Sequence, residues 1–231
     1  MKKVILGIFA VIIVVGLSWV GYNFHQNTQI NNQSLNELIL KGTNKQVIQK
    51  IASGVDVNEE EQGVTPLMLA SIVQRDVKVF EALIGAGANV SYKDSNGVSP
   101  IMFASGMQSA EIVKLLIDSG ADINDANVNG QTPLMFAAEM NADTEVMNVL
   151  IDAGANMNYE SSEGKKAILS AAMSNNNIDV LKTLIARGAE VDNKDLMVLI
   201  ANQADVDVVK VLIEAGADIN YKDKNKFTPL I

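Results

Sequence analysis

Pairs of short apolar runs at helical spacing recur along residues 34–231, and a glycine follows each pair. In the run 111–118, for example, Ile112, Leu115 and Leu116 share one helical face. A glycine just after such a run suits the left-handed conformation that ends a helix. One helix pair cannot bury its apolar face alone, whereas stacked pairs can. The pattern therefore predicts an all-α stack of helix pairs.

Two short signatures mark the period of this pattern. The first is a glycine followed by an alternating segment: Gly54-Val-Asp-Val-Asn58, Gly87-Ala-Asn-Val90, Gly120-Ala-Asp-Ile-Asn124, Gly154-Ala-Asn-Met-Asn158, Gly188-Ala-Glu-Val-Asp192 and Gly216-Ala-Asp-Ile-Asn220. The second precedes each pair: Gly63-Val-Thr-Pro-Leu67, Gly97-Val-Ser-Pro-Ile101, Gly130-Gln-Thr-Pro-Leu134, a decayed Gly164-Lys-Lys-Ala-Ile168 and Phe227-Thr-Pro-Leu230. Proline suits the first turn of a helix, and the Thr or Ser before it can cap that turn.

A period near 33 residues with these two signatures resembles the ankyrin repeat, and the resemblance covers residues 34–231. It implies an all-α repeat solenoid in which each unit has a helix-turn-helix and a β-hairpin finger. It also implies protein binding through the finger tips and the exposed face of the first helices. We expect helix pairs to begin near Ser34, Pro66, Pro100, Pro133, Ala167 and Leu196, with a truncated seventh at Pro229.

The sequence departs from the family pattern in three ways. Met68, Met102 and Met135 stand where the family usually has a histidine that hydrogen-bonds within and between repeats, so we expect apolar packing there. The step from Gly188 to Leu196 is 8 residues against 12 or 13 elsewhere, which predicts a clipped finger. Finally, the sequence ends inside a helix start. We interpret this end as truncation or degeneration of the array, in preference to a partner that covers it.

An uncharged stretch near the N-terminus predicts a membrane anchor. At 1.5 Å per residue, 17 to 21 helical residues span roughly 25–31 Å, close to the hydrocarbon thickness of a bilayer. Lys2 and Lys3 precede the stretch, and Trp19, Tyr22 and Phe24 lie at its far end, as interfacial aromatics do. The predicted organisation is a cytoplasmic N-terminus at 1–3, a transmembrane signal-anchor helix at 4–24, a polar flexible stalk at 25–33 and an extracytoplasmic ankyrin domain at 34–231.

The alternative is a cleaved secretory signal peptide. The apolar stretch is longer than the usual ~7–15 residues of such a peptide, and Trp19 and Val20 stand where small residues should precede a cleavage site. A weak site at Gly16-Leu-Ser18 keeps this alternative open. Both interpretations export the remainder of the chain. The short Lys-Lys start fits a bacterium, where the anchor would lie in the cytoplasmic membrane and the array in the periplasm.

Charge and composition narrow the class of partner. The net charge is −9, and without the two N-terminal lysines 16 basic residues face 27 acidic ones. An acidic field of this size repels phosphate backbones, which argues against nucleic acid as a partner. Aromatic residues make up only 5% of the chain, as expected of a core built from small, regular layers.

The residue inventory argues against catalysis. The chain has no cysteine, and His25, its single histidine, lies in the predicted stalk. Neither a Ser/His/Asp or Cys/His arrangement nor a His- or Cys-rich zinc site can therefore form. The carboxylate groups at 59–61 and at Asp205 and Asp207 are interpreted as solvated loop charge, although an enzyme that uses carboxylates remains the less favoured alternative. We expect no cofactor, no metal and no small-molecule substrate.

The predicted function is therefore that of a non-enzymatic scaffold or regulator that binds a protein. Carried over from the family by position, the candidate binding residues lie at the finger tips: Tyr92, Lys93, Asp94, Asn96, Asp125, Asn127, Asn129, Tyr159, Glu160, Glu163, Tyr221, Lys222 and Asp223. The three tyrosines occupy matching positions, and tyrosine is frequent at binding hot spots. Packing of each tyrosine on its neighbouring finger is an equally good interpretation. Gln74, Met107, Gln108, Met140 and Asn141, near the ends of first helices, are secondary candidates.

Overall fold

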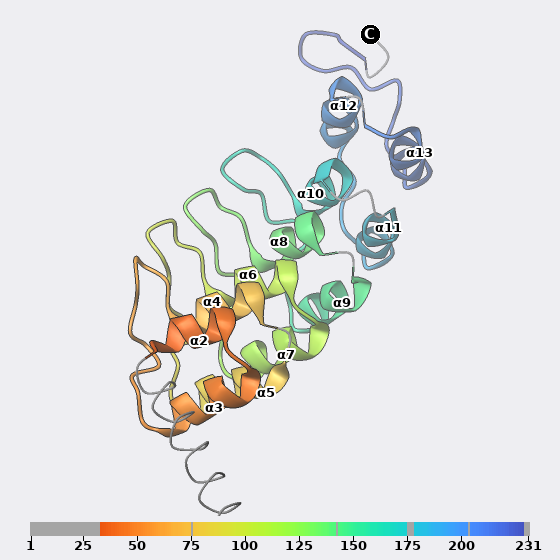
Figure 1. Ribbon diagram of the computed structural model, residues 1–231. Helices are drawn as coiled ribbons and strands as arrows, with labels where there is room; N and C mark the ends of the chain where they lie inside the picture. Colours follow the sequence, from red (N-terminus) through yellow and green to blue (C-terminus); the bar gives the residue numbers. More distant parts are fainter. Residues whose placement is uncertain (1–32, 75, 142, 175–177, 203, 229–231) are drawn as a thin grey trace, which may run out of the picture.

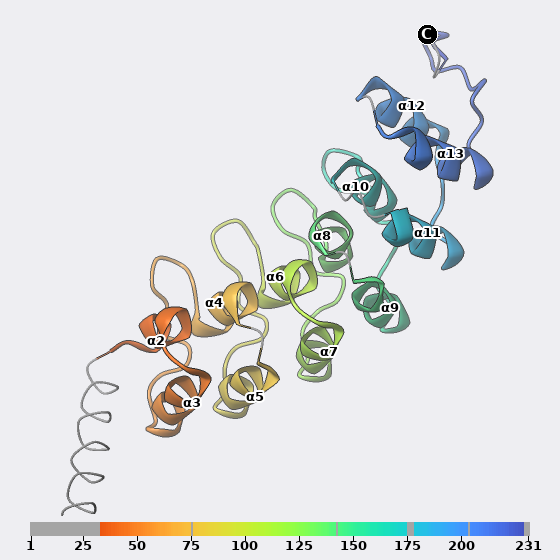
Figure 2. The same cartoon turned by 45° about the vertical axis from the view of Figure 1, so that its right-hand side comes forward.

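Two rows of short helices stack side by side along a gently curved array, and long loops project beyond one row (Figures 1 and 2). The computed structural model describes residues 33–74, 76–141, 143–174, 178–202 and 204–228. The row beside the loops contains the first helix of each unit: α2 (Leu35–Lys41), α4 (Pro66–Val73), α6 (Pro100–Met107), α8 (Pro133–Met140), α10 (Ala167–Ser174) and α12 (Asn193–Ala201). The other row contains the second helices: α3 (Asn44–Ala52), α5 (Val77–Gly85), α7 (Ala110–Asp118), α9 (Thr144–Asp152), α11 (Ile178–Ala186) and α13 (Val206–Glu214).

The first helices begin where their caps predict, with one exception treated below. Prolines open α4, α6 and α8, and Ser34 caps α2. The hydroxyls of Thr65 and Thr132 accept hydrogen bonds from backbone N–H groups one turn later, at 3.3 and 3.4 Å. Ser99 makes no such bond, so α6 lacks this part of the predicted cap. The second helices end at glycines with φ between 83° and 103°, which confirms the predicted left-handed stops.

The core lies between the two rows and passes from unit to unit. Each first helix buries apolar side chains toward its own partner helix and toward the neighbouring first helices. Met68, Met102 and Met135 are buried, so apolar packing does replace the expected histidine. Gly106 lets α6 and α8 approach closely, because a Cβ there would lie 3.3 Å from the Met140 side chain.

Buried side-chain amides tie the first helices together, a feature that we call the amide ladder. Gln74, just after α4, donates to the Ile39 carbonyl of the preceding unit at 2.8 Å. Gln108, just after α6, repeats this contact with the carbonyl of Ser71 at 2.8 Å. Asn141, just after α8, donates to the Ser105 and Gln108 carbonyls at 3.0 Å. The three secondary binding candidates with amide side chains therefore hold the array together.

The sixth unit differs from its sequence-based prediction. Helix α12 begins at Asn193, three residues before the predicted Leu196. The reason is a capping box in place of the missing proline signature. The Asp192 carboxylate accepts from the Lys194 N–H at 2.9 Å, and Asp195 accepts from the Asp192 N–H at 3.2 Å. The chain passes directly from Gly188 into this cap, so the predicted clipped finger is confirmed as a nearly absent one (Figure 1).

Four other predictions concern residues that the structure leaves undescribed. The cytoplasmic N-terminus, the 4–24 anchor and nearly all of the stalk fall within residues 1–32, and the truncated seventh unit begins at Pro229. Among the helices that are described, none has the length and apolar character needed to cross a membrane.

The amide ladder generates a stability prediction. Replacement of Gln108 by Ala removes the donor to a fully buried helix carbonyl, which we expect to lower the free energy of unfolding by about 1–3 kcal/mol. Thermal and urea unfolding followed by circular dichroism measures this change. Asn96→Ala, which removes an exposed amide from a finger tip, is the matched control and should leave the transition in place. Equal transitions for the two variants would contradict a structural role for the ladder.

Candidate partner-binding surface

The fingers are shaped by short polar side chains near their tips. Asp94 Oδ1 accepts from the backbone N–H groups of Asn96 and Val98 at 2.9 and 2.8 Å. Asn127 and Asp223 form the same pair of bonds in their own fingers. Three of the predicted binding residues thus have an intramolecular task, which is to close the turn.

The first finger is built differently because it is one residue shorter. Glu61 and Val64 exchange two backbone hydrogen bonds of 3.1 Å around Gln62 and Gly63, whose φ values are 56° and 80°. Two successive left-handed residues form the tight hairpin that a two-residue loop requires. The carboxylates of Glu59, Glu60 and Glu61 are left at an exposed tip.

Neighbouring fingers are joined backbone to backbone. The Val128 N–H donates to the Asn96 carbonyl at 2.9 Å, and the Ser162 N–H donates to the Asn129 carbonyl at 3.0 Å. Glycine at 130 permits the second contact, because a Cβ there would lie 2.9 Å from the Ser162 nitrogen. The second, third and fourth fingers therefore form one connected edge rather than three independent loops.

Side chains add further links between fingers. The Lys93 ammonium forms an ion pair with Asp125 of the next finger, and the Tyr92 hydroxyl donates to the Glu60 carboxylate of the finger before. This hydrogen bond raises the pKa of the Tyr92 phenol. For Tyr92 the structure therefore matches the neighbour-packing interpretation. Tyr159 keeps 36% of its surface exposed.

The remaining predicted residues lie along the same edge without converging on one point. Glu160 and Glu163 are exposed on the fourth finger, and Lys165 pairs with Glu163 at 2.7 Å, which lowers the pKa of that carboxyl. Tyr221 is half-buried and Lys222 exposed on the last finger. The missing fifth finger separates this last pair from the others (Figure 1).

The exposed side of the first helices is apolar, and we call it the first-helix ledge. It consists of the outward residues at two matching positions of α4, α6 and α8: Leu69 and Val73, Phe103 and Met107, and Phe136 and Met140. The Phe103 and Phe136 rings meet edge to face, with centroids 6.4 Å apart and planes at 83°. Met140 is 48% exposed, so this secondary candidate remains open to a partner, whereas Met107 is half-buried.

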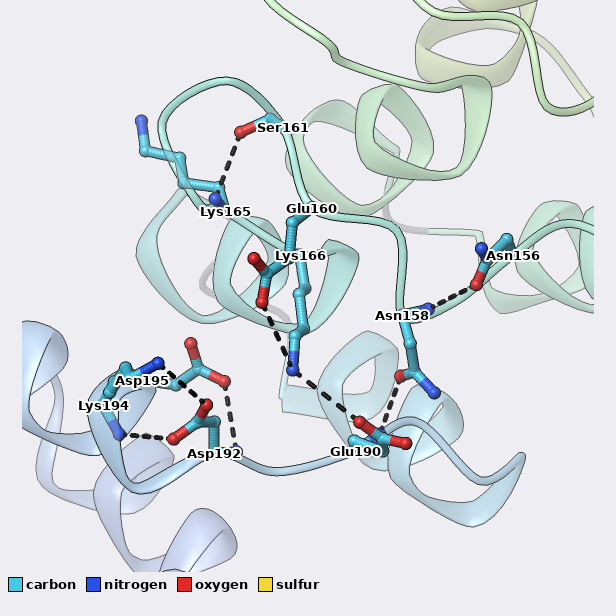
Figure 3. A network of polar contacts seen from close by, with 10 residues as sticks. All are labelled: Asn156, Asn158, Glu160, Ser161, Lys165, Lys166, Glu190, Asp192, Lys194 and Asp195. Carbon is cyan, nitrogen blue, oxygen red and sulfur yellow. Dashed lines mark hydrogen bonds and ion pairs between the residues drawn. The ribbon is translucent and has the colours of Figure 1, made fainter.

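A groove with charged and apolar side chains lies next to the short connection from Gly188 to α12, and Figure 3 shows several of its charged residues. It lies between α10 and α12 and has a volume of about 470 Å³. The Lys166 side chain, only 9% exposed, places its ammonium 4.0 Å from Glu160 and 3.9 Å from Glu190. On the α12 side, the buried Asp195 carboxylate lies beside the Asp192–Lys194 pair.

Comparison with known proteins identifies the repeat. The family described as "Ankyrin repeats (3 copies)" matches residues 31–127 and 122–195, and "Ankyrin repeat" matches residues 196–224. The chain belongs to the ankyrin-repeat family. It is also similar to the human "Fibronectin type 3 and ankyrin repeat domains protein 1", with 50% identity over 50 residues, or 22% of this chain and 14% of that protein. The matched part is thus a small fraction of the human protein.

Ankyrin repeats are protein–protein interaction modules. No group of three or more His, Asp or Glu side chains suited to a metal ion occurs in the part of the chain that the structure describes. Among the carboxylates considered in the sequence, Asp205 caps α13 and Asp207 pairs with Lys210 at 2.9 Å. Both therefore have structural partners.

Sequence reasoning missed Lys166 and Asp195, which line the groove, and Glu190, which pairs with Lys166. Their sequence contexts are unremarkable, because a lysine before a helix and carboxylates near a cap are ordinary surface features. The short step from Gly188 to the next helix was the available signal.

Asp195 generates a prediction about pH. Burial raises the pKa of its carboxyl, although the Asp192 N–H and the Lys166 charge act in the opposite direction. A carboxyl whose pKa is higher in the folded chain favours folding while protonated, and this contribution is lost as pH rises through the folded pKa. Asp195→Asn keeps the acceptor for the cap but cannot ionise. We expect the melting temperature of this variant minus that of the wild type to increase as pH rises from about 4, near the ordinary aspartate pKa, to 7.

Glu163→Gln provides the opposite control, because its pKa is lowered by Lys165. Here the melting temperature of the wild type minus that of the variant should increase as pH rises above the ordinary glutamate pKa. The increase should be small, since Glu163 is exposed. Thermal melts at several pH values measure both differences. A difference between Asp195→Asn and the wild type that does not change with pH would contradict the prediction.

Proposed function

We propose that this chain is a non-enzymatic scaffold or regulator whose ankyrin array, displayed outside the cytoplasm, binds a protein through the first-helix ledge and the finger edge. The observation that carries the proposal is the apolar ledge of α4, α6 and α8 beside fingers that are joined to one another. Val73 and Met140 are exposed, and the Phe103 and Phe136 rings are half-buried beside them. Contiguous exposed apolar surface of this kind is typical of interaction sites.

The rigidity of this surface favours binding. Backbone bonds between the second, third and fourth fingers and the amide ladder beneath them fix the positions of the contact residues before a partner arrives. Less conformational entropy is then lost on association. Flexible loops of the same composition would lose more conformational entropy on association and would therefore bind more weakly.

The proposed location rests on the N-terminal sequence. Lys2 and Lys3, the uncharged stretch that begins at Val4 and the aromatic residues at its end support a signal anchor with the N-terminus in the cytoplasm. Cleavage after the stretch would instead give a soluble secreted or periplasmic ankyrin protein. In both cases the array acts outside the cytoplasm, in a bacterium in the periplasm.

The absence of cysteine from the sequence makes the location testable. A single Asn96→Cys substitution places a thiol on an exposed finger tip, and Lys3→Cys places one before the apolar stretch. We expect a membrane-impermeant maleimide to label the Asn96→Cys variant in intact spheroplasts and the Lys3→Cys variant only after lysis. Labelling of the Asn96→Cys variant only after lysis would contradict the extracytoplasmic location. A mature Lys3→Cys chain that takes up no label even after lysis would indicate cleavage.

The binding surface is tested by in-cell crosslinking. A photo-crosslinking residue at Met140 should capture a discrete partner, and the same residue at Val206, an exposed apolar position on α13, should not. The added substitution Tyr159→Ala should reduce capture at Met140 several-fold, whereas Tyr92→Phe should preserve it because the Tyr92 hydroxyl is bound to Glu60. Equal capture from Met140 and Val206 would contradict the assignment of the ledge.

A further inference from the structure

The first-helix ledge repeats with the spacing of the helices that carry it. Each of α4, α6 and α8 contributes two apolar side chains that are half-buried or exposed, and these helices lie side by side in one row (Figure 2). Packed helices are about 8–10 Å apart, so the ledge offers three pairs of apolar contacts at roughly that interval. A partner that uses all three pairs must present apolar residues on one side at the same interval.

An α-helix satisfies this requirement and an extended strand does not. Seven helical residues advance about 10.5 Å and return to nearly the same face. Same-face residues of a strand are about 6.6 or 13 Å apart, and a residue at about 10 Å points to the opposite side. The register of the ledge therefore favours a helix with apolar residues at heptad spacing that runs along the row from α4 to α8.

The charges around the ledge indicate which side of such a helix should be basic. Within α4, α6 and α8 the single charged residue is Glu139. The fingers beside these helices are acidic: the first carries Asp56, Glu59, Glu60 and Glu61 without a basic residue, and the third carries Asp122 and Asp125. Lys93 on the second finger pairs with Asp125, and Lys165 and Lys166 on the fourth lie beside Glu163 and Glu160. The excess negative charge therefore lies mainly on the first finger. A complementary partner has lysine or arginine on the flank that faces the fingers.

We infer that the ledge binds an amphipathic, basic α-helix of a protein partner, about three heptads long, with its apolar stripe on Phe103, Phe136 and Met140 and its cationic flank toward the Glu59–Glu61 tip. This inference rests on the proposed function and specifies the class of partner. A helix of about 21 residues covers roughly 31 Å, enough for three neighbouring units. The apolar contacts supply affinity, and the acidic fingers set orientation and raise the association rate.

The test uses three fluorescent 21-residue peptides and the full chain in nanodiscs of uncharged lipid, with empty discs subtracted. The first peptide has leucine at two positions per heptad and lysine on one flank. The second has glutamate in place of lysine, and the third has the first composition shuffled so that no heptad remains. We expect anisotropy to show saturable binding of the first peptide only, with a gain in peptide helicity by circular dichroism.

Two matched pairs of variants locate the site. Met140→Ser should weaken binding about fivefold to tenfold, while Val206→Ser on α13 should not. Changing Glu59, Glu60 and Glu61 together to Gln should weaken binding at low salt and reduce its salt dependence. The same charge change at the exposed second-helix residues Glu81, Glu111 and Glu214 should have little effect. Thermal melts verify that each variant is folded.

Equal binding of the shuffled or the acidic peptide would overturn the inference, as would equal effects of the Met140 and Val206 variants. No binding of any peptide, together with specific capture at Met140 in cells, would reject the basic helix and leave the protein-binding function standing. No binding and no capture would reject both.

Discussion

Three successive first helices, α4, α6 and α8, are each tied to the one before by a side-chain amide that enters the preceding unit and binds a backbone carbonyl. Gln74, Gln108 and Asn141 repeat this contact at the ends of α4, α6 and α8. The carbonyls lie near the ends of helices, where intrahelical partners run out, and they are buried away from water. Without the amides they would remain unpaired in the interior, at a cost of a few kcal/mol. The ladder thereby performs between units the task that the family's histidine commonly performs, and this leaves Met68, Met102 and Met135 free to pack as apolar residues.

A second ladder runs through the bases of the fingers. Asn58 donates to the Gly87 carbonyl at 2.9 Å and accepts from the Asn89 N–H at 2.7 Å, and Asn124 makes the same pair of contacts with Gly154 and Asn156. In the unit between them Ser91 stands at this position, and there Lys93 reaches Asp125 of the next finger. Different side chains thus supply successive links, which is why the fingers stay in register although their sequences vary.

Strong local signals explain what could be predicted from the sequence. Pro66, Pro100 and Pro133 fixed the helix starts because proline is tolerated in the first turn and excluded from the interior. The predicted start of α12 was wrong because a capping box is a weaker sequence signal for a helix start than proline. Asp192, the cap residue, can be interpreted equally well as a finger residue.

The candidate binding residues stay a prediction, because the contacts that decide their role depend on neighbours 30 or more residues away. The same residue type serves different purposes at finger tips. Asp94, Asn127 and Asp223 close turns, whereas Glu160 remains exposed on the fourth finger. The three turn-closing residues lie three positions before Gly97, Gly130 and Lys226, a spacing that turn chemistry explains. Lys226 adopts φ 66° where the others have glycine, so the last finger carries backbone strain that the regular ones avoid.

Loss of the fifth finger divides the array into two surfaces with different physical character. Up to α8, the amide ladder and the joined fingers hold an apolar ledge in place, and apolar contact supplies binding free energy without demanding fixed polar partners. Beyond α10, the uncovered groove contains Lys166 between Glu160 and Glu190, with the buried Asp195 opposite. Any ligand entering there must compensate charges that already have partners, which makes the groove selective and its contribution to affinity small. The proposed binding surface therefore lies on the regular units, and the irregular junction would limit how far along the array an apolar partner extends.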